Sequence, residues 1–179
     1  MNLINQEGLD FYHEIREKSG QPIELCYQCR KCAAGCIANE HADFYPNEII
    51  RLVQLGQKEK VLNCKSIWIC SSCETCGARC PNGINTRAII DALKEKAIAD
   101  KLVKDNKVYL FHTQFLNSVQ MNGRVHEPMM MALYKLKSKD LWSDLDFGFN
   151  MFRKGKMPLL PSRVKDRRAI KQIFKQSQN

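Results

Sequence analysis

The sequence of 179 residues lacks long hydrophobic runs. Its apolar stretches extend over a few residues, whereas a bilayer-spanning helix needs roughly 20. The first residues, MNLINQEGLDFYHEI, also lack the charged and apolar regions of a secretory signal. We therefore expect a cytoplasmic protein without direct membrane insertion. In that compartment, clustered cysteines bind metal more often than they form disulfides.

Motifs of common catalytic and nucleotide-binding sites are absent as well. The sequence contains no G-x-G-x-x-G, no P-loop and no G-x-S-x-G. No RNP, helix-turn-helix or zinc-finger pattern accompanies its basic residues, which argues against a nucleic-acid partner. Nothing in the sequence therefore indicates a catalytic residue or a substrate site of its own.

Strand-like alternation is missing too, and helical periodicity replaces it. Ile89, Ile90, Leu93 and Ala97, for example, recur at the spacing of one helix face. We predict a mainly α fold, with helices over Gly8–Lys18, Asn47–Gln54, Thr86–Ala99, Lys107–Gln120, Pro128–Leu136, Leu141–Phe152 and Lys165–Lys175.

The net charge of +9 is concentrated at the C-terminal end. Residues 150–179 hold nine Lys or Arg and a single acid, Asp166, while the first 149 residues hold nineteen basic and eighteen acidic side chains. The protein is thus a nearly neutral body with a basic tail. We expect the tail to dock on an acidic protein partner or to form a solvated face.

Nine cysteines are present, and eight of them form an internal repeat. The first motif, Cys26–Cys36, has the spacing C-x2-C-x2-C-x3-C, and the second motif, Cys70–Cys80, repeats it 44 residues later. Pro81 follows the second motif, whereas Ile37 follows the first. The ninth cysteine, Cys64, lies outside both motifs, as a core thiol or a substitute ligand.

Zinc is the first alternative for such thiols, but structural zinc sites usually combine two C-x2-C pairs across a longer loop. Here three thiolates arrive within seven residues, twice, and this crowding suits a cluster whose irons each take one thiolate. In bacterial ferredoxins with two [4Fe–4S] clusters, the fourth cysteine of each motif ligates the other motif's cluster. We therefore predict two crossed ligand sets. Set one is Cys26, Cys29, Cys32 and Cys80, and set two is Cys70, Cys73, Cys76 and Cys36.

With these motifs, the sequence resembles the C subunit of heterodisulfide reductase. The likeness rests on the paired motifs and on the run W-x-C-x2-C-x2-C-x3-C-P from Trp68 to Pro81. It also rests on the basic C-terminal segment GKMPLLPSRVKDRRAIKQIF, Gly155 to Phe174. Other α-helical ferredoxins, such as the iron–sulfur subunits of succinate dehydrogenase and of anaerobic glycerol-3-phosphate dehydrogenase, share the cysteine motifs alone.

The resemblance implies an α-helical ferredoxin with two [4Fe–4S] clusters and helical extensions at both ends. Residues 1–100 would form the ferredoxin core with its N-terminal helix, and residues 101–179 a helical extension with the basic tail, as part of the same domain or as a docking arm. The chain would relay electrons from the family's A subunit, which contains flavin and iron–sulfur centres, to its disulfide-reducing B subunit.

In methanogens the acceptor of such complexes is the CoM–CoB heterodisulfide, reduced with flavin-based electron bifurcation, and related complexes in acetogens and sulfate reducers use other acceptors. The sequence does not specify the host or the acceptor. Two other functions remain open: an iron–sulfur subunit of another anaerobic dehydrogenase complex, and an interaction module that its clusters merely stabilise.

Overall fold

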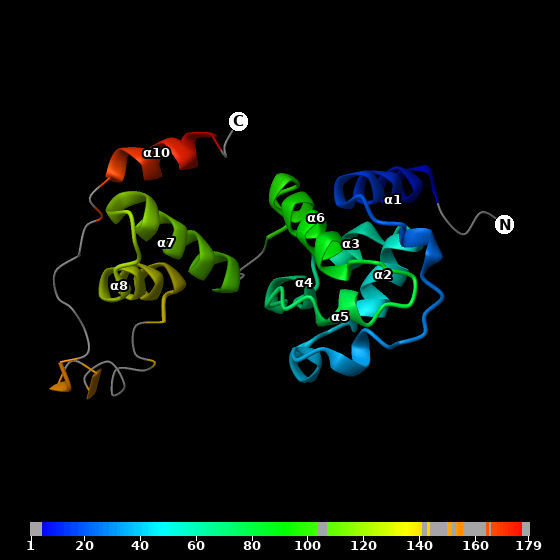
Figure 1. The fold of residues 1–179 in the computed structure, drawn as a ribbon, viewed down its shortest axis with the longest axis horizontal. Coiled ribbons are helices and arrows are strands. Elements are labelled where there is room, and N and C mark those ends of the chain that lie inside the picture. Colours follow the sequence, from blue (N-terminus) through cyan, green and yellow to red (C-terminus); the bar gives the residue numbers. More distant parts are fainter. Residues whose placement is uncertain are drawn as a thin grey trace. The chain divides into compact units, whose positions relative to one another are not determined.

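A computed structural model describes residues 5–103, 107–140, 143, 150, 151, 153–155, 164 and 166–176. These residues form helices joined by turns, and no strand occurs among them, which confirms the predicted mainly α fold. The chain divides into two compact units, residues 1–105 and 106–179 (Figure 1). The assignment of residues 1–100 and 101–179 to a ferredoxin core and an extension stays a prediction.

The first unit is built around one central helix, α6 (Thr86–Ala99), which contacts every other α-helix of the unit (Figure 1). Those helices are α1 (Gln6–Ser19), α2 (Pro46–Gln54), α3 (Lys58–Leu62), α4 (Ser66–Ile69) and α5 (Thr75–Ala78). Three 3-10 turns lie in the first half of the unit: η1 (Ile23–Leu25), η2 (Ala33–Gly35) and η3 (Asn39–His41).

The sequence explains why α6 begins and packs as it does. The side chain of Asn85 caps the helix by accepting a hydrogen bond from the Ala88 amide at 3.3 Å. The apolar residues that predicted the helix, Ile89, Ile90, Leu93 and Ala97, are all buried. They face the buried Phe11 and Ile15 of α1 and the apolar residues of α2 to α4, and this burial is the main stabilising contribution to the unit.

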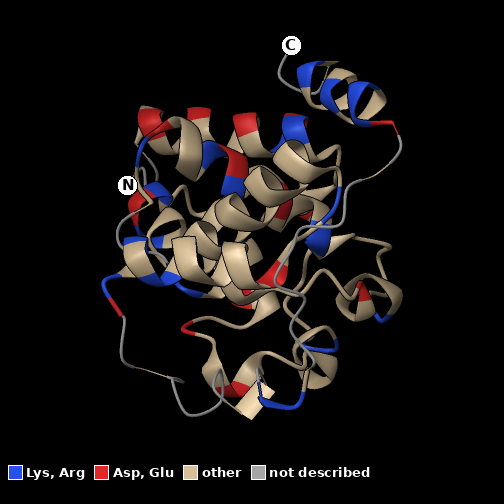
Figure 2. Cartoon of the chain, turned by 90° about the vertical axis from the view of Figure 1, so that its left-hand side faces the viewer, with Lys and Arg blue, Asp and Glu red and all other residues tan. Residues whose placement is uncertain are grey.

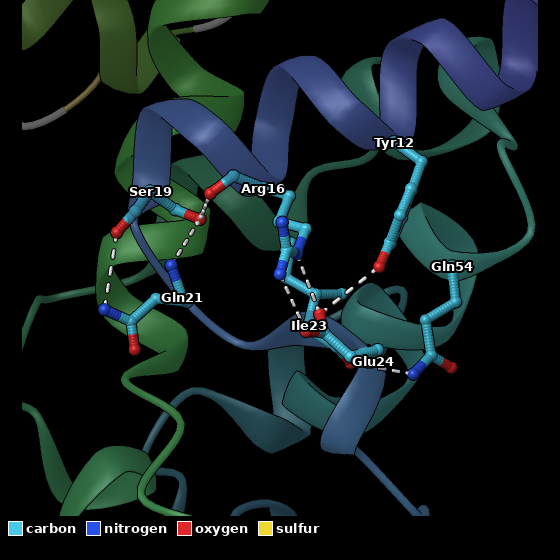
Figure 3. A network of polar contacts seen from close by, with 7 residues as sticks. All are labelled: Tyr12, Arg16, Ser19, Gln21, Ile23, Glu24 and Gln54. Atoms are coloured by element: carbon cyan, nitrogen blue, oxygen red, sulfur yellow. Dashed lines mark hydrogen bonds and ion pairs between the residues drawn. The ribbon is translucent and has the colours of Figure 1, made fainter.

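A network of polar contacts fixes the segment that leads from α1 into the first motif (Figure 3). Helix α1 ends at Gly20, whose φ of 61° is the left-handed conformation that glycine adopts readily. Arg16 then binds Glu24 through two nitrogens, at 3.0 and 2.9 Å. Gln54 of α2 donates hydrogen bonds to the carbonyl oxygens of Ile23 and Cys26, at 2.8 and 3.3 Å. The segment from Ile23 to Cys26, the first cysteine of the motif, is therefore tied to both helices.

The loop after the first motif is tied to the segment before the second. The Phe44 amide donates to Ser66 Oγ at 2.8 Å, and the Lys65 amide donates to Asp43 Oδ2 at 2.6 Å. Helices α3, α4 and α5 were not predicted, because elements of four or five residues are too short to display a helical period.

The second unit contains α7 (Lys107–Asn122), α8 (Glu127–Ser138) and α10 (Arg167–Gln176). Helix α7 contacts both others, and Gly123 ends it with a φ of 81°. Lys and Arg recur along α10 (Figure 2). The predicted helix Leu141–Phe152 lies mostly outside the described residues. Across the part of the chain that is described, no helix has the length and apolar character needed to cross a membrane.

The buried side of α7 is not the side that carries its large apolar residues. Phe111 and Phe115, which helped to predict the helix, are 36% and 39% exposed. The buried residues are polar instead: Gln114, Ser118 and Asn122, spaced four apart. Ser118 accepts a hydrogen bond from the His126 amide at 2.9 Å, which closes the turn into α8. Helical periodicity located the helix, but its hydrophobic residues did not identify the buried face.

We expect Ile15→Ala to destabilise the first unit by about 2–5 kcal/mol, because the side chain is fully buried and its removal leaves a cavity between α1 and α6. Leu9→Ala on the same helix is the matched control, since Leu9 is 40% exposed. Thermal unfolding followed by circular dichroism under anaerobic conditions measures the difference. Equal midpoints for the two variants would contradict this packing.

Candidate metal centre

Cavity one brings together the four cysteines of set one. Its lining contains Cys26, Cys29 and Cys32 of the first motif together with Cys80 of the second. Cys32 is buried, Cys26 and Cys80 are partly buried, and Cys29 is exposed. The rest of the lining comes from the first motif, from α2, from the turn after Cys80 and from the start of α6: Tyr27, Gln28, Arg30, Asn47, Ile50, Pro81, Asn82 and Thr86.

Cavity two brings together the four cysteines of set two. Cys70, Cys73 and Cys76 of the second motif line it with Cys36 of the first. Here again the middle cysteine, Cys73, is the exposed one. The structure thus places each sequence-predicted set around a separate cavity, with one residue exchanged between the motifs. That each set binds one [4Fe–4S] cluster stays a prediction.

Two contacts interlock the motifs. The side-chain amide of Asn82, just beyond Cys80, donates a hydrogen bond to the carbonyl oxygen of Leu25, just before Cys26. Arg79 lies against Gly35, where a β-carbon would come within 2.6 Å of the guanidinium carbon. Each contact joins a residue near a crossing cysteine to the opposite motif. The crossing is thereby built into the packing of η2 against α5.

Backbone conformation repeats between the motifs. Gln28 and Arg30, on either side of Cys29, have φ values of 62° and 64°, and Ser72 and Glu74, on either side of Cys73, have 56° and 59°. Left-handed φ costs a non-glycine residue roughly 1 kcal/mol or more. Such conformations persist where the surroundings enforce them, often at functional sites. The two motifs are therefore structural as well as sequence repeats.

Polar side chains form hydrogen bonds with the sulfurs of two cysteines. Gln28 Nε2 lies 3.3 Å from Cys26 Sγ and also donates to the Asn47 carbonyl at 3.0 Å. Asn47 Nδ2 donates in return to Gln28 Oε1 at 3.0 Å, so that the amide is held at both ends. In the second motif, Thr75 Oγ1 lies 3.5 Å from Cys73 Sγ and lowers the pKa of that thiol. These residues would tune the sulfurs of a bound cluster.

Burial has the opposite effect on the pKa of two other thiols. It raises the pKa of Cys32 to about 11 and also raises the pKa of Cys76, because a lone thiolate is poorly solvated there. These sulfurs become good ligands only when bound cations compensate their charge, so that cluster binding would release protons.

Thr86, the first residue of α6, lines cavity one, and it is 1% exposed. Its side chain also interacts with the thiol of Cys76 in set two, which partly offsets the effect of burial on the pKa of that thiol. The Thr86 hydroxyl would therefore be a hydrogen-bond donor to sulfur where the two sets meet. Among the described residues, no three Cys, His, Asp or Glu side chains group as they would around a single metal ion.

Some functional residues were missed by sequence reasoning. Asn47 and Asn82 lie outside the motifs, and nothing in their type or spacing marks them. Gln28 lies inside a motif, but its contact with Asn47 depends on where α2 packs. Cys64 lines neither cysteine cavity. It is buried, and its thiol donates to the Val61 carbonyl at 3.1 Å, as expected of a core thiol.

Comparison with known proteins places these motifs in context. The profile of the 4Fe-4S dicluster domain family matches residues 25–85, the segment that contains all nine cysteines. This match supports [4Fe–4S] clusters as the bound group.

Curated relatives come from methanogenic archaea. The chain is 28% identical over 95 residues to the C subunit of the H2:CoB-CoM heterodisulfide,ferredoxin reductase of Methanothermobacter thermautotrophicus, over 52% of this chain and 50% of the relative. It is 31% identical over 102 residues to the iron-sulfur C subunit of the CoB–CoM heterodisulfide reductase of Methanopyrus kandleri, over 51% and 52%. With the corresponding C subunit 2 of Methanocaldococcus jannaschii it shares 29% identity over 128 residues, 66% and 68% of the two chains. The matched region thus spans about half the length of the first two relatives.

We expect Gln28→Leu to lower the reduction potential of the cluster in cavity one, because a hydrogen bond to sulfur stabilises the more negative reduced state. Ser72→Ala, at the equivalent position of the second motif, is the matched control. Redox titration followed by electron paramagnetic resonance measures both variants. The role of Gln28 is refuted if the potentials of Gln28→Leu match those of the wild type while the cluster is retained.

Proposed function

We propose that the chain is an iron–sulfur subunit of the heterodisulfide reductase C type, as its relatives and its 4Fe-4S dicluster match indicate, and that it relays single electrons through two [4Fe–4S] clusters between two other subunits. The 4Fe-4S dicluster profile and the names of the relatives support an iron–sulfur electron-transfer role. The observation that carries the two-cluster relay is the pair of cavities, each lined by four cysteines drawn from both motifs.

Two clusters in one small unit suit a relay. A [4Fe–4S] cluster accepts and gives up one electron with little change in structure, and two neighbouring clusters pass an electron on without a substrate. The chain's own residues hold the sulfurs, donate hydrogen bonds to them and limit the access of water. Cys29 and Cys73 are the exposed members of the two sets, so that each cluster would have one edge that a partner can approach.

The partners we propose are those of the family. The A subunit, which contains flavin and iron–sulfur centres, would supply electrons, and the disulfide-reducing B subunit would receive them. The curated relatives are named for the CoB–CoM heterodisulfide, and this disulfide, or another acceptor of the same class, is the proposed end of the path.

The basic tail is proposed to dock on an acidic surface of one of these partners. Helix α10 alone carries Arg167, Arg168, Lys171 and Lys175, and its apolar Ile173 is 60% exposed. We expect deletion of residues 153–179 to weaken assembly of the complex, and rising salt to weaken the intact complex, because exposed charges are screened. Size-exclusion chromatography at low and high salt tests both expectations. Assembly that is unaffected by deletion and by salt would contradict tail docking.

The relay predicts the iron and sulfide content of the protein and the reduction of its clusters by a partner. Protein purified without oxygen should contain roughly eight irons and eight sulfides per chain, as two [4Fe–4S] clusters require, and the reduced flavin-containing partner should reduce both clusters on mixing. Chemical analysis and stopped-flow absorbance measure these quantities. About four irons would contradict the two-cluster proposal. Eight irons that the flavin-containing partner cannot reduce would favour a cluster-stabilised interaction module.

A further inference from the structure

Large apolar side chains are exposed beside the cysteines of the first motif. In residues 5–103 of the structure, five such side chains are exposed: Leu9, Leu25, Tyr27, Ile37 and Ile98. Three of the five adjoin a ligand cysteine. Leu25 and Tyr27, 52% and 61% exposed, stand on either side of Cys26, and Tyr27 lines cavity one. Single exposed apolar residues are ordinary, but two such side chains on either side of Cys26, at the edge of cavity one, indicate a contact surface.

The same surface is positively charged. Arg30 and Lys31 directly follow the exposed Cys29, and both are exposed. Within the described part of the chain, neither pairs with a carboxylate; Arg30 lies over the Tyr45 ring at 5.6 Å. Glu24, which precedes the motif in the sequence, is bound to Arg16 at 2.9 Å. The charge at this edge is therefore available to a partner.

Cavity two differs in this respect. The charged residues of its lining are Glu74 and Arg87, which bind each other at 3.0 Å. The exposed apolar residue at its edge, Ile37, is not followed by a cation. The two cavities thus offer different surfaces although their motifs are repeats.

We propose that Leu25, Tyr27, Arg30 and Lys31, around Cys29, form a docking surface for an electron-transfer protein with an acidic rim around an apolar patch. We call this surface the set-one rim. The proposal rests on the relay function and adds to it which cluster faces the acidic partner. Across the interface, one electron leaves the reduced centre of one protein and enters the oxidised cluster of the other, and no bond or proton is exchanged.

Charge selects this occupant over two others. The chain's own tail is strongly basic and would place cations against Arg30 and Lys31. A second copy that docked through its own set-one rim would do the same. Like charges in contact are unfavourable, whereas opposite charges raise the association rate and fix orientation. The apolar centre would exclude water from the edge nearest to the cluster.

Lys31→Glu, with Lys60→Glu as its matched control, tests the set-one rim. Both lysines are exposed, and Lys60, on α3, lines neither cysteine cavity. The two proteins that copurify with the chain are separated, and their association with each variant is measured by surface plasmon resonance at low salt and at about 0.5 M salt. Lys31→Gln, a milder change, is measured in parallel, and iron content confirms that each variant retains its clusters.

We expect Lys31→Glu to slow association with one of the two partners about tenfold at low salt, with little effect on dissociation and a much smaller difference at high salt. Lys31→Gln should give a smaller effect in the same direction, and Lys60→Glu an association rate within about twofold of the wild type. Equal effects of Lys31→Glu and Lys60→Glu, or no effect of either substitution of Lys31, would overturn the set-one rim. If the wild-type clusters exchange no electrons with either partner, the relay fails, and the docking proposal falls with it.

Discussion

The first unit depends on one geometric constraint: four sulfurs must converge on each cavity, and in each set one comes from the other motif. Cys80 joins three residues that lie 48 to 54 positions before it, and Cys36 joins three that lie 34 to 40 positions after it. Each motif thus supplies three cysteines to one cavity and its fourth to the other. The helices between the motifs must therefore return the chain to its starting point, and the small core serves this purpose.

The surrounding contacts are arranged to maintain that convergence. Helix α6 follows the second motif directly and supplies the surface on which α1 to α5 pack. The hydrogen bond from Asn82 to Leu25 and the packing of Arg79 on Gly35 hold the two crossing points. The paired left-handed residues around Cys29 and Cys73 give both motifs one backbone shape. Apolar burial positions the helices, and these few polar and steric contacts position the sulfurs.

The sequence predicted the features that depend on neighbouring residues, and it did not predict those that depend on contacts between distant residues. The long helices were located because apolar spacing, such as that of Ile89, Ile90, Leu93 and Ala97, is a local signal. The crossed grouping of cysteines was available from the spacing of known two-cluster ferredoxins. By contrast, the contact between Gln28 and Asn47 spans 19 residues, and the polar buried face of α7 depends on its neighbours. That neither Arg30 nor Lys31 pairs with a carboxylate in the described part of the chain also depends on side-chain positions, which sequence spacing does not specify.

The central claim, that the two motifs exchange their fourth cysteines, is tested most directly by paramagnetic resonance of cysteine variants reduced without oxygen. If the sets are crossed, Cys80→Ala and Cys29→Ala damage the same cluster and leave the same residual spectrum. Cys36→Ala and Cys73→Ala then share the complementary spectrum. A spectrum of Cys80→Ala that matches Cys73→Ala would mean that each motif holds its own cluster, and it would contradict the account given above.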